Sequence, residues 1–247
     1  AVTEQQTRTR NILVENLLTF DRTFGDHKVS ALVGYTYQDS RYRYMQGSGQ
    51  GMPTGITEID AASQGLAVSG NSSRSVLTSI LGRAFYSYKN RYLLTATIRR
   101  DGSSNFGPNN KWGTFPSVSL GWNVTNEKFM EKRPEWFSKM KLRLSWGKNG
   151  NEAIGAFRYT ANVAIGNNYT FGGAGNQVIM GGSKPSGTPN ADLKWEESEQ
   201  TDIGLDFGFF DSALTFTVDY YKKKTNGMLM TMPIPSYVGE TKPIGNV

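Results

Sequence analysis

Five carboxylates lie close together in the sequence, and paired carboxylates can hydrolyse glycosidic bonds by acid–base catalysis. They are Glu196, Glu197, Glu199, Asp202 and Asp206. The segment that carries them alternates apolar and polar side chains, which is typical of a β-strand. A strand turns Glu196, Asp202 and Asp206 to one face, and Glu197 and Glu199 to the other. We therefore interpret them as charges on hydrated surfaces and expect no catalytic residue and no enzymatic activity.

The remaining side chains offer little to a metal ion, a cofactor or a nucleophile. The chain has no cysteine and a single histidine, His27. Zinc sites and catalytic triads need several such partners, so we expect no metal site and no cofactor. The run Gly47-Ser48-Gly49-Gln50-Gly51 has the composition of a phosphate-binding loop, but no helix pattern follows it. We expect this run to lie in a long polar loop.

The positive charge of the chain does not indicate a nucleic-acid partner. The net charge of +6 comes from 27 basic and 21 acidic residues that are scattered along the sequence. Nucleic-acid-binding proteins gather such charge on one face. The densest run, Lys222-Lys223-Lys224, lies at the end of a predicted strand. These cations are expected at solvated strand ends and in loops.

The dominant period of the sequence is two, which predicts an all-β, antiparallel fold. Most of the eight predicted strands are longer than the five or six residues usual in globular proteins, and they match the 9 to 11 residues that cross a bilayer in a tilted strand. The predicted strands are residues 10–20, 28–38, 75–88, 91–100, 112–124, 139–148, 198–208 and 213–224.

The connections alternate between tight turns and long polar segments. Tight turns are predicted around Gly25, at Lys89-Asn90 and at 209–212, whereas residues 39–74, 101–111 and 149–196 are predicted as long loops. One link, 125–138, is expected to hold one or two helical turns. If the strands run up and down, all long loops lie on one side, as in outer-membrane barrels. No apolar run is long enough for a membrane helix.

Each face of the predicted strands carries its own kind of side chain. Aromatic residues near strand ends are expected to form interfacial girdles against a lipid bilayer: Tyr86, Tyr88, Tyr92, Trp112, Trp122 and Trp146. Charged residues of the opposite face are predicted to line a hydrated lumen: Arg83, Arg99, Lys141, Arg143, Asp202, Asp206 and Asp219. Within the second set we expect Arg143 and Asp202 to form a cross-strand ion pair that fixes strand register.

Four segments closely resemble the C-terminal barrel of SusC/RagA-type TonB-dependent transporters, which are outer-membrane proteins of Bacteroidota. They are residues 81–130, 141–151, 190–210 and 214–229. The resemblance is carried by a strand end, a strand start and a later segment that follow one another in the family's order: Arg100-Asp101-Gly102-Ser103-Ser104, Trp112-Gly113-Thr114-Phe115-Pro116-Ser117 and Asp192-Leu193-Lys194-Trp195-Glu196.

This resemblance implies about eight consecutive strands of a plugged barrel of about 22 strands. It implies import of oligosaccharides or peptides, a SusD-like surface lipoprotein as a lid, and energy from the TonB complex through an N-terminal part that is not in this sequence. Residues 1–247 are then a partial outer-membrane barrel domain in a Gram-negative cell, without the plug and without a signal peptide. The first residues, AVTEQQTRTR, lack the apolar core of a signal peptide.

Two other classes of protein remain open from the residues alone. One is a small self-standing eight-strand barrel with an adhesin or structural role, which requires residues 10–20 to pair with 213–224. The other is a surface carbohydrate hydrolase with a β-sandwich fold. In either transporter or adhesin, the loop 149–196 offers aromatic rings for stacking on a ligand, namely Tyr159, Tyr169 and Phe171.

Overall fold

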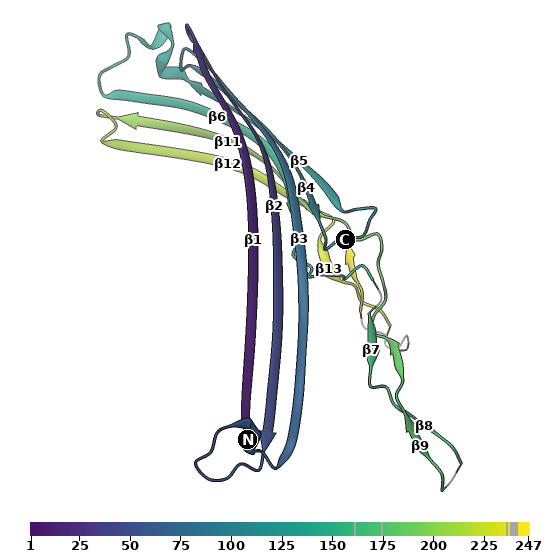
Figure 1. The fold of residues 1–247 in the computed structure, drawn as a ribbon. Helices are drawn as coiled ribbons and strands as arrows, with labels where there is room; N and C mark the ends of the chain where they lie inside the picture. Colours follow the sequence, from purple (N-terminus) through teal and green to yellow (C-terminus); the bar gives the residue numbers. More distant parts are fainter. Residues whose placement is uncertain (161, 174, 236, 238–241) are drawn as a thin grey trace.

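The chain forms one long, curved antiparallel sheet, seen in the computed structural model of residues 1–247 (Figure 1), which describes all residues other than 161, 174, 236 and 238–241. The order of its eight strands is β1-β2-β3-β4-β5-β6-β11-β12. Their bounds are β1 Val2–Phe24, β2 His27–Gln50, β3 Gln64–Tyr88, β4 Tyr92–Ser103, β5 Trp112–Asn123, β6 Phe137–Asn151, β11 Glu196–Phe209 and β12 Leu214–Asn226. All eight predicted strands are present, so the antiparallel all-β prediction is confirmed.

The register divides the sheet into two chemically different faces. Directly paired residues point to the same side of a sheet. The pairings therefore show which residues share a face, from Phe20–Ala31 on β1–β2 to Leu205–Val218 on β11–β12. One face carries a band of Leu, Ile, Val, Ala, Phe and Tyr, and many of these side chains are exposed. The other face carries mostly Ser, Thr, Gly and charged side chains, with apolar ones such as Leu81, Leu93 and Phe115 among them. We call them the apolar face and the polar face.

The strands β1, β2 and β3 are much longer than predicted. They have 23, 24 and 25 residues, and the prediction of a loop over 39–74 was wrong for most of its length. Only residues 51–63 connect β2 to β3, and they contain the short 3₁₀ turn η1 Ile59–Ala61. The glycine-rich run that was expected in a loop instead ends β2. These extensions are rich in Thr, Ser, Gln and Tyr, which suit a hydrated strand, but both of their faces are polar.

The opposite end of the sheet is closed by short turns. Gly25 and the pair Lys89-Asn90 have positive φ angles of 56°, 51° and 53°, a conformation that is typical of tight hairpin turns. The link between β5 and β6 holds two 3₁₀ turns, η2 Val124–Asn126 and η3 Lys128–Met130, in agreement with the expected helical turns. No helix in the described part of the chain is long and apolar enough to cross a membrane.

The longest connection, between β6 and β11, folds into two small ribbons. β7 Val163–Ile165 pairs with β10 Ser183–Pro185, and β8 Tyr169–Phe171 pairs with β9 Val178–Met180. A further pair, β13 Leu229–Thr231 and β14 Ile244–Asn246, lies beside the root of this connection. Figure 1 shows the ribbons projecting away from the end of the sheet where β4, β5 and β6 meet their long loops.

The sheet is open, and its two edges are β1 and β12. The strand order ends with these two strands, and no pairing joins them among the described residues. The self-standing eight-strand barrel required such a pairing. If these strands cross a bilayer, the parts of β1 and β12 that lie in hydrocarbon need partner strands, because unpaired backbone groups are not tolerated there.

Candidate functional site

The polar face of β6, β11 and β12 is organised by one arginine. Arg143 lies across from Gly204, and its guanidinium donates from Nε and Nη2 to the two carboxylate oxygens of Asp206 at 2.9 and 3.0 Å. The same Nη2 donates to Asp219 Oδ1 at 2.7 Å. Thr217 Oγ1 completes the group with a hydrogen bond of 3.2 Å to Asp206. Two carboxylates from neighbouring strands thus share a single cation.

The predicted partner of Arg143 was wrong. Asp202 lies opposite Ser145, because the true register is shifted by two residues from the expected one. A shift of two leaves every side chain on its face, so the predicted polar set shares one face although the predicted pair does not form. Gly204 is the residue that the sequence reasoning missed. A Cβ atom there would come within 2.6 Å of Arg143 Nη2 and would also collide with Asp219.

A second group of polar side chains lies nearer the loops on the same face, on β3 and β4. Arg99 donates to Asp101 at 2.7 Å and to Ser79 Oγ at 3.0 Å, and both acceptor residues are buried. Arg83 donates to Thr97 at 3.3 Å. The register therefore brings all seven residues predicted for the lumen, from Arg83 to Asp219, onto one face.

Two shallow hollows on the polar face contain most of these side chains. One, of about 290 Å³, is lined by Lys141, Arg143 and Asp202 together with Thr95 and Ser119. The other, of about 570 Å³, lies nearer the loops and is lined by residues that include Arg83, Arg99 and Asp101. Charged and hydroxyl groups line both hollows beside apolar side chains such as Leu93 in the first and Leu81 in the second, so the surface offers polar and apolar contacts to a solute.

An apolar cluster anchors the long loop between β6 and β11 to the end of the sheet where the long loops lie, which we call the mouth. It consists of Phe106, Phe115, Ile154, Leu193 and Trp195, all buried. The ring of Trp195 lies 5.1 Å from that of Phe106 and 5.4 Å from that of Phe115, and its Nε1 donates to the Lys111 carbonyl at 3.2 Å. Because Phe115 is on the polar face, this cluster holds the root of the loop over that side of the sheet.

A buried carboxyl group lies beside this cluster. Burial raises the pKa of Glu152; a hydrogen bond with Ser103 opposes this shift, and the charge of Asp101 adds to it. Asn105 donates to the backbone carbonyl of Glu152 at 3.4 Å. The Glu152 Oε2 atom and the Asn105 Oδ1 atom are buried without a hydrogen-bond partner in the described part of the chain. The protonated form of Glu152 is therefore favoured more than in water.

The three aromatic residues predicted to contact a ligand occupy different environments. Tyr159 packs against the apolar cluster and is partly buried. Tyr169 and Phe171 lie on β8 at the far end of the loop, are 48% and 64% exposed, and hold their rings 5.5 Å apart in an edge-to-face arrangement. Of the three, the pair on β8 presents free ring surface to a ligand.

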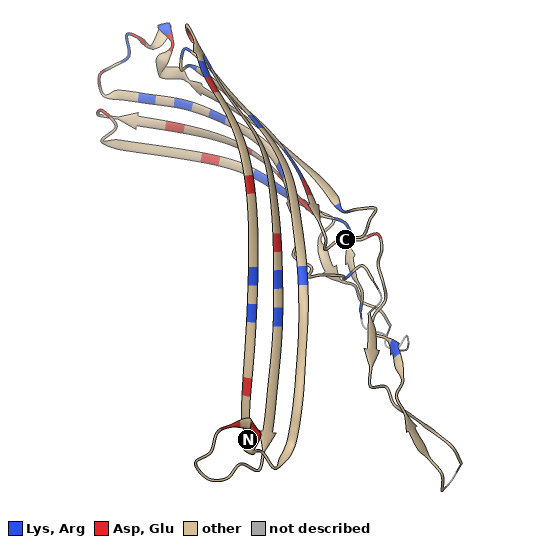
Figure 2. Ribbon diagram, viewed as in Figure 1, with Lys and Arg blue, Asp and Glu red and all other residues tan. Residues whose placement is uncertain are grey.

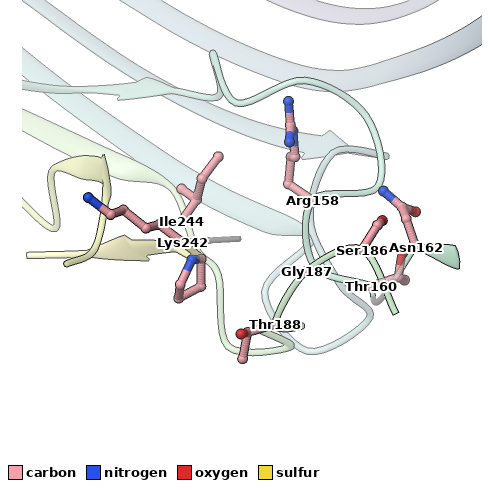
Figure 3. Close-up of a pocket in the computed structure, with 9 residues that line it drawn as sticks. Arg158, Thr160, Asn162, Ser186, Gly187, Thr188, Lys242 and Ile244 are labelled. Carbon is pink, nitrogen blue, oxygen red and sulfur yellow. The ribbon is translucent and has the colours of Figure 1, made fainter. Parts of the chain in front are cut away.

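A small pocket lies between the long loop and the segment before β14. Arg158, Asn162 and Ser186 line it from the loop, and Lys242 and Ile244 line it from the other side (Figure 3). Its volume of about 50 Å³ accommodates one or two water molecules rather than a sugar or peptide. We therefore interpret it as part of the packing between these two segments.

The six aromatic residues predicted for the girdles all lie on the apolar face, as the register requires. Near the short turns, Tyr88 and Tyr92 stack with ring centroids 6.5 Å apart, and Trp122 Nε1 donates to Glu127 Oε1 at 3.1 Å. The bonds from Tyr92 and Trp122 lower the pKa of Glu127. Tyr86 lies on β3 beside this group, while Trp112 and Trp146 lie farther toward the loops.

The comparisons with known proteins agree with this geometry. Residues 2–247 match the family model described as TonB dependent receptor-like, beta-barrel. The chain belongs to this family. It is 42% identical over 163 residues, 66% of this chain, to the TonB-dependent receptor SusC of Bacteroides thetaiotaomicron, of which 16% is covered. It is 35% identical over 245 residues, 97% of this chain, to TonB-dependent receptor P3 of Formosa agariphila, of which 24% is covered.

Solved structures give the same result. The chain superimposes on a structure of the RagAB peptide transporter with a TM-score of 0.89 and 27% identity, over 99% of this chain and 27% of that one. The RagAB peptide importer in an "open-open" state gives 0.85. The resemblance to SusC/RagA-type receptors is thus confirmed. The chain spans about a quarter of the length of these relatives. Their names describe them as receptors or transporters. TonB-dependent receptor barrels are outer-membrane proteins of Gram-negative bacteria.

Proposed function

We propose that this chain forms part of the wall of a TonB-dependent importer in the outer membrane of a Bacteroidota cell. The observation that carries the proposal is the division of the sheet into two faces. The apolar face meets lipid, between aromatic residues at its two ends, while the polar face lines a lumen through which cargo passes. The open edges β1 and β12 support a larger barrel of about 22 strands over the self-standing alternative.

The ion group around Arg143 has a positioning role in this proposal. One guanidinium that is held by Asp206 and Asp219 joins three strands, β6, β11 and β12. Charged pairs that face a wet lumen contribute modestly to stability, but they restrict the register of the wall. Lys141 and Asp202 line the hollow beside this group and offer their charges to water, to the plug of the receptor or to polar cargo.

The long loops are proposed to contact the cargo and a SusD-like surface lipoprotein. The ribbon that carries Tyr169 and Phe171 extends beyond the mouth, and its exposed rings suit stacking on sugar faces or peptide side chains. RagAB is named as a peptide transporter, whereas the relative with 42% identity is SusC. Oligosaccharides and peptides are both proposed as cargo classes, and TonB is the proposed energy source.

Cysteine accessibility in the full-length receptor tests the proposed lumen. Single cysteines are placed at Leu142, Arg143, Leu144 and Ser145 of β6 in outer membranes and treated with a membrane-impermeant maleimide. We expect Arg143→Cys and Ser145→Cys to be labelled and Leu142→Cys and Leu144→Cys to be protected by lipid. Equal labelling of all four positions would contradict the assignment of the two faces to lumen and lipid.

A growth experiment distinguishes the two cargo classes. Strains that lack the receptor or its lipoprotein are grown on oligosaccharides or on peptides as the sole nutrient.

A further inference from the structure

The apolar face of β1, β2 and β3 carries a compact group of five arginines, which we call the arginine patch. Arg10 pairs with Arg41, and Arg41 pairs with Arg74, so three arginines lie side by side across the strands. Arg8 and Arg43 pair directly in the next row. Figure 2 shows these cations as blue bands that lie together on the three long strands. None of them belongs to the polar face described above.

The charges of the patch are mostly uncompensated. Asp39 is its one carboxylate, buried between Arg74 at 2.9 Å and Arg41 at 3.1 Å. Arg8, Arg10 and Arg43 have no carboxylate within ion-pair distance in the described part of the chain, and all three are exposed. Glu4 is on the same face but lies two rows beyond Arg8. Like charges directly opposite each other on a sheet are destabilising, so this arrangement favours a bound anion.

The position of the patch along the strands indicates which anion is available. On β1 the apolar face runs from Phe24, at the short-turn end, to Ile12, and Arg10 follows in the next row. At a rise of about 3.3 Å per residue and a tilt of about 40°, Arg10 stands about 35 Å above Phe24. The hydrocarbon core is about 30 Å thick. The patch thus lies at the level of the headgroups of the outer leaflet.

We propose that the arginine patch binds phosphate groups of the anionic lipid headgroups that surround the barrel in the outer leaflet. Guanidinium groups bind phosphate through paired, charge-assisted hydrogen bonds. Two adjacent rows of guanidinium groups suit a headgroup with two phosphates better than one with a single phosphate. The proposal rests on the membrane orientation given under the proposed function, and it adds a lipid-binding site on the outside of the wall.

Titration with a defined lipid tests the proposal. Native mass spectrometry of the detergent-purified full-length receptor measures its affinity for diphosphoryl lipid A. The patch variant replaces Arg8, Arg10 and Arg43 by Gln, which keeps the Asp39 ion pairs. A cation near an anionic membrane surface contributes about fivefold in affinity, so we expect a loss on the order of 100-fold. Monophosphoryl lipid A should bind the parent more weakly, and millimolar inorganic phosphate should not compete.

A matched control removes the same charge elsewhere. Arg22, Lys28 and Lys132 lie near the short-turn end, and their replacement by Gln should change the affinity less than about twofold. Equal losses in both variants would overturn the proposal. So would a patch variant that keeps its lipid but no longer co-purifies with the surface lipoprotein, because the patch would then serve a protein partner. If the patch variant does not reach the outer membrane, Arg43→Gln alone should lower the affinity about fivefold.

Failure of the lipid site is distinguishable from failure of the proposed function. Maleimide labelling at Arg143→Cys and Ser145→Cys reports on the lumen and does not involve the patch. Unchanged labelling together with unchanged lipid binding in the patch variant rejects the lipid site alone. Loss of the alternating labelling in the parent receptor rejects the membrane wall, and the lipid site with it.

Discussion

All eight strands of the main sheet cross the same apolar band, but β1, β2 and β3 end differently from the other five. β4 and β5 have 12 residues each and finish near the band, where the loops fold into the apolar cluster around Trp195. β2 and β3 continue with β1 well past the band as a three-stranded ribbon. In the proposed wall, the membrane sets the length that all eight strands share, and the length of each strand beyond the band depends on what the strand supports there.

The two regions also differ in what stabilises them. Around the mouth, loops are held by buried apolar rings and by hydrogen-bonded polar groups. In the extensions, backbone hydrogen bonds between neighbouring strands carry most of the structure, because most side chains of β1 and β3 there are exposed. Substitutions should therefore have large effects at the mouth, intermediate effects on the polar face, and small effects in the extensions.

The largest effect is expected for Trp195→Ala. The substitution removes a buried ring from the apolar cluster, and such losses cost about 3–5 kcal/mol. In the full-length receptor we expect the loop 152–195 to become sensitive to protease while the sheet remains folded. Tyr169→Ala, at the exposed end of the same loop, serves as the control and should leave proteolysis unchanged. Equal protection of the loop in both variants would show that the cluster does not hold it.

A smaller effect is expected for Gly204→Ala. The added methyl group meets the guanidinium of Arg143 and the carboxylate of Asp219, and overpacking of this kind costs about 1–3 kcal/mol. Thermal unfolding of the receptor in detergent measures this loss of stability. Gly82→Ala is the control, because the nearest atom to its added Cβ lies at 3.5 Å. Gly208→Ala is less suitable, because its Cβ comes within 3.0 Å of neighbouring atoms.

The same region offers a test of the revised ion pairing. In double-mutant cycles, Arg143→Ala and Asp206→Ala should couple by about 0.5–3 kcal/mol, while Arg143→Ala and Asp202→Ala should be additive within about 0.5 kcal/mol. Unfolding of the single and double variants and the parent gives both values. Strong coupling to Asp202 instead would restore the register that the sequence suggested.

A pH-dependent effect is expected at the mouth. The pKa of Glu152 is raised in the folded state, so the folded protein binds this proton more tightly than the unfolded chain. The contribution is therefore fully present at low pH and is lost as the pH rises from the unfolded value through the raised one. Glu152→Gln should remove this dependence and stabilise the loop at neutral pH, measured by protease sensitivity between about pH 4 and pH 8. An unchanged pH profile would exclude Glu152 as the titrating group.

The smallest effect is expected in the extensions. Val68 on β3 is 83% exposed, so Val68→Ser should change the unfolding free energy by less than about 0.5 kcal/mol. Hydrogen exchange offers a sharper measurement, since amides of residues 44–49 should exchange faster than those of residues 29–37 in the same strand. Uniform protection along β2 would indicate that another part of the receptor covers the extension.

The sequence predicted the apolar band of the sheet well because the two faces of the sheet require different side chains there, apolar on one face and mostly polar on the other. Tyr92, Leu94, Ala96 and Ile98 lie on the apolar face, and their neighbours lie on the polar one, so the pattern is clear. The same cause is missing beyond the apolar band, where both faces are polar. Residues such as Thr7, Thr9, Ser72 and Ser73 give no alternation, and the extensions of β1, β2 and β3 were therefore predicted as loop or left unassigned.

On the polar face, the periodic pattern predicts which side of the sheet a residue lies on, but not which residue it pairs with. Face assignment follows from period two, so all seven polar residues could be grouped on one side. The pairing of Arg143 depends on register, and a shift by two residues preserves the pattern. Gly204, between Asp202 and Asp206, was the available signal, because a glycine in a strand often marks a close approach of neighbouring groups. The apolar cluster had a weaker signal, since Phe106 and Leu193 stand alone in polar segments.

In the proposed barrel, the free edge of β1 restricts the strand that would pair with it. Between Val14 and Phe24 its free backbone groups would lie at the depth of the hydrocarbon, so a partner strand must satisfy each of them. Between Val2 and Arg10 the same groups face water and can be hydrated instead. The hydrocarbon therefore sets a minimum length for the adjoining strand, whereas water sets no maximum length. Insertions and deletions in that neighbour should be tolerated above Arg10 and rejected below it.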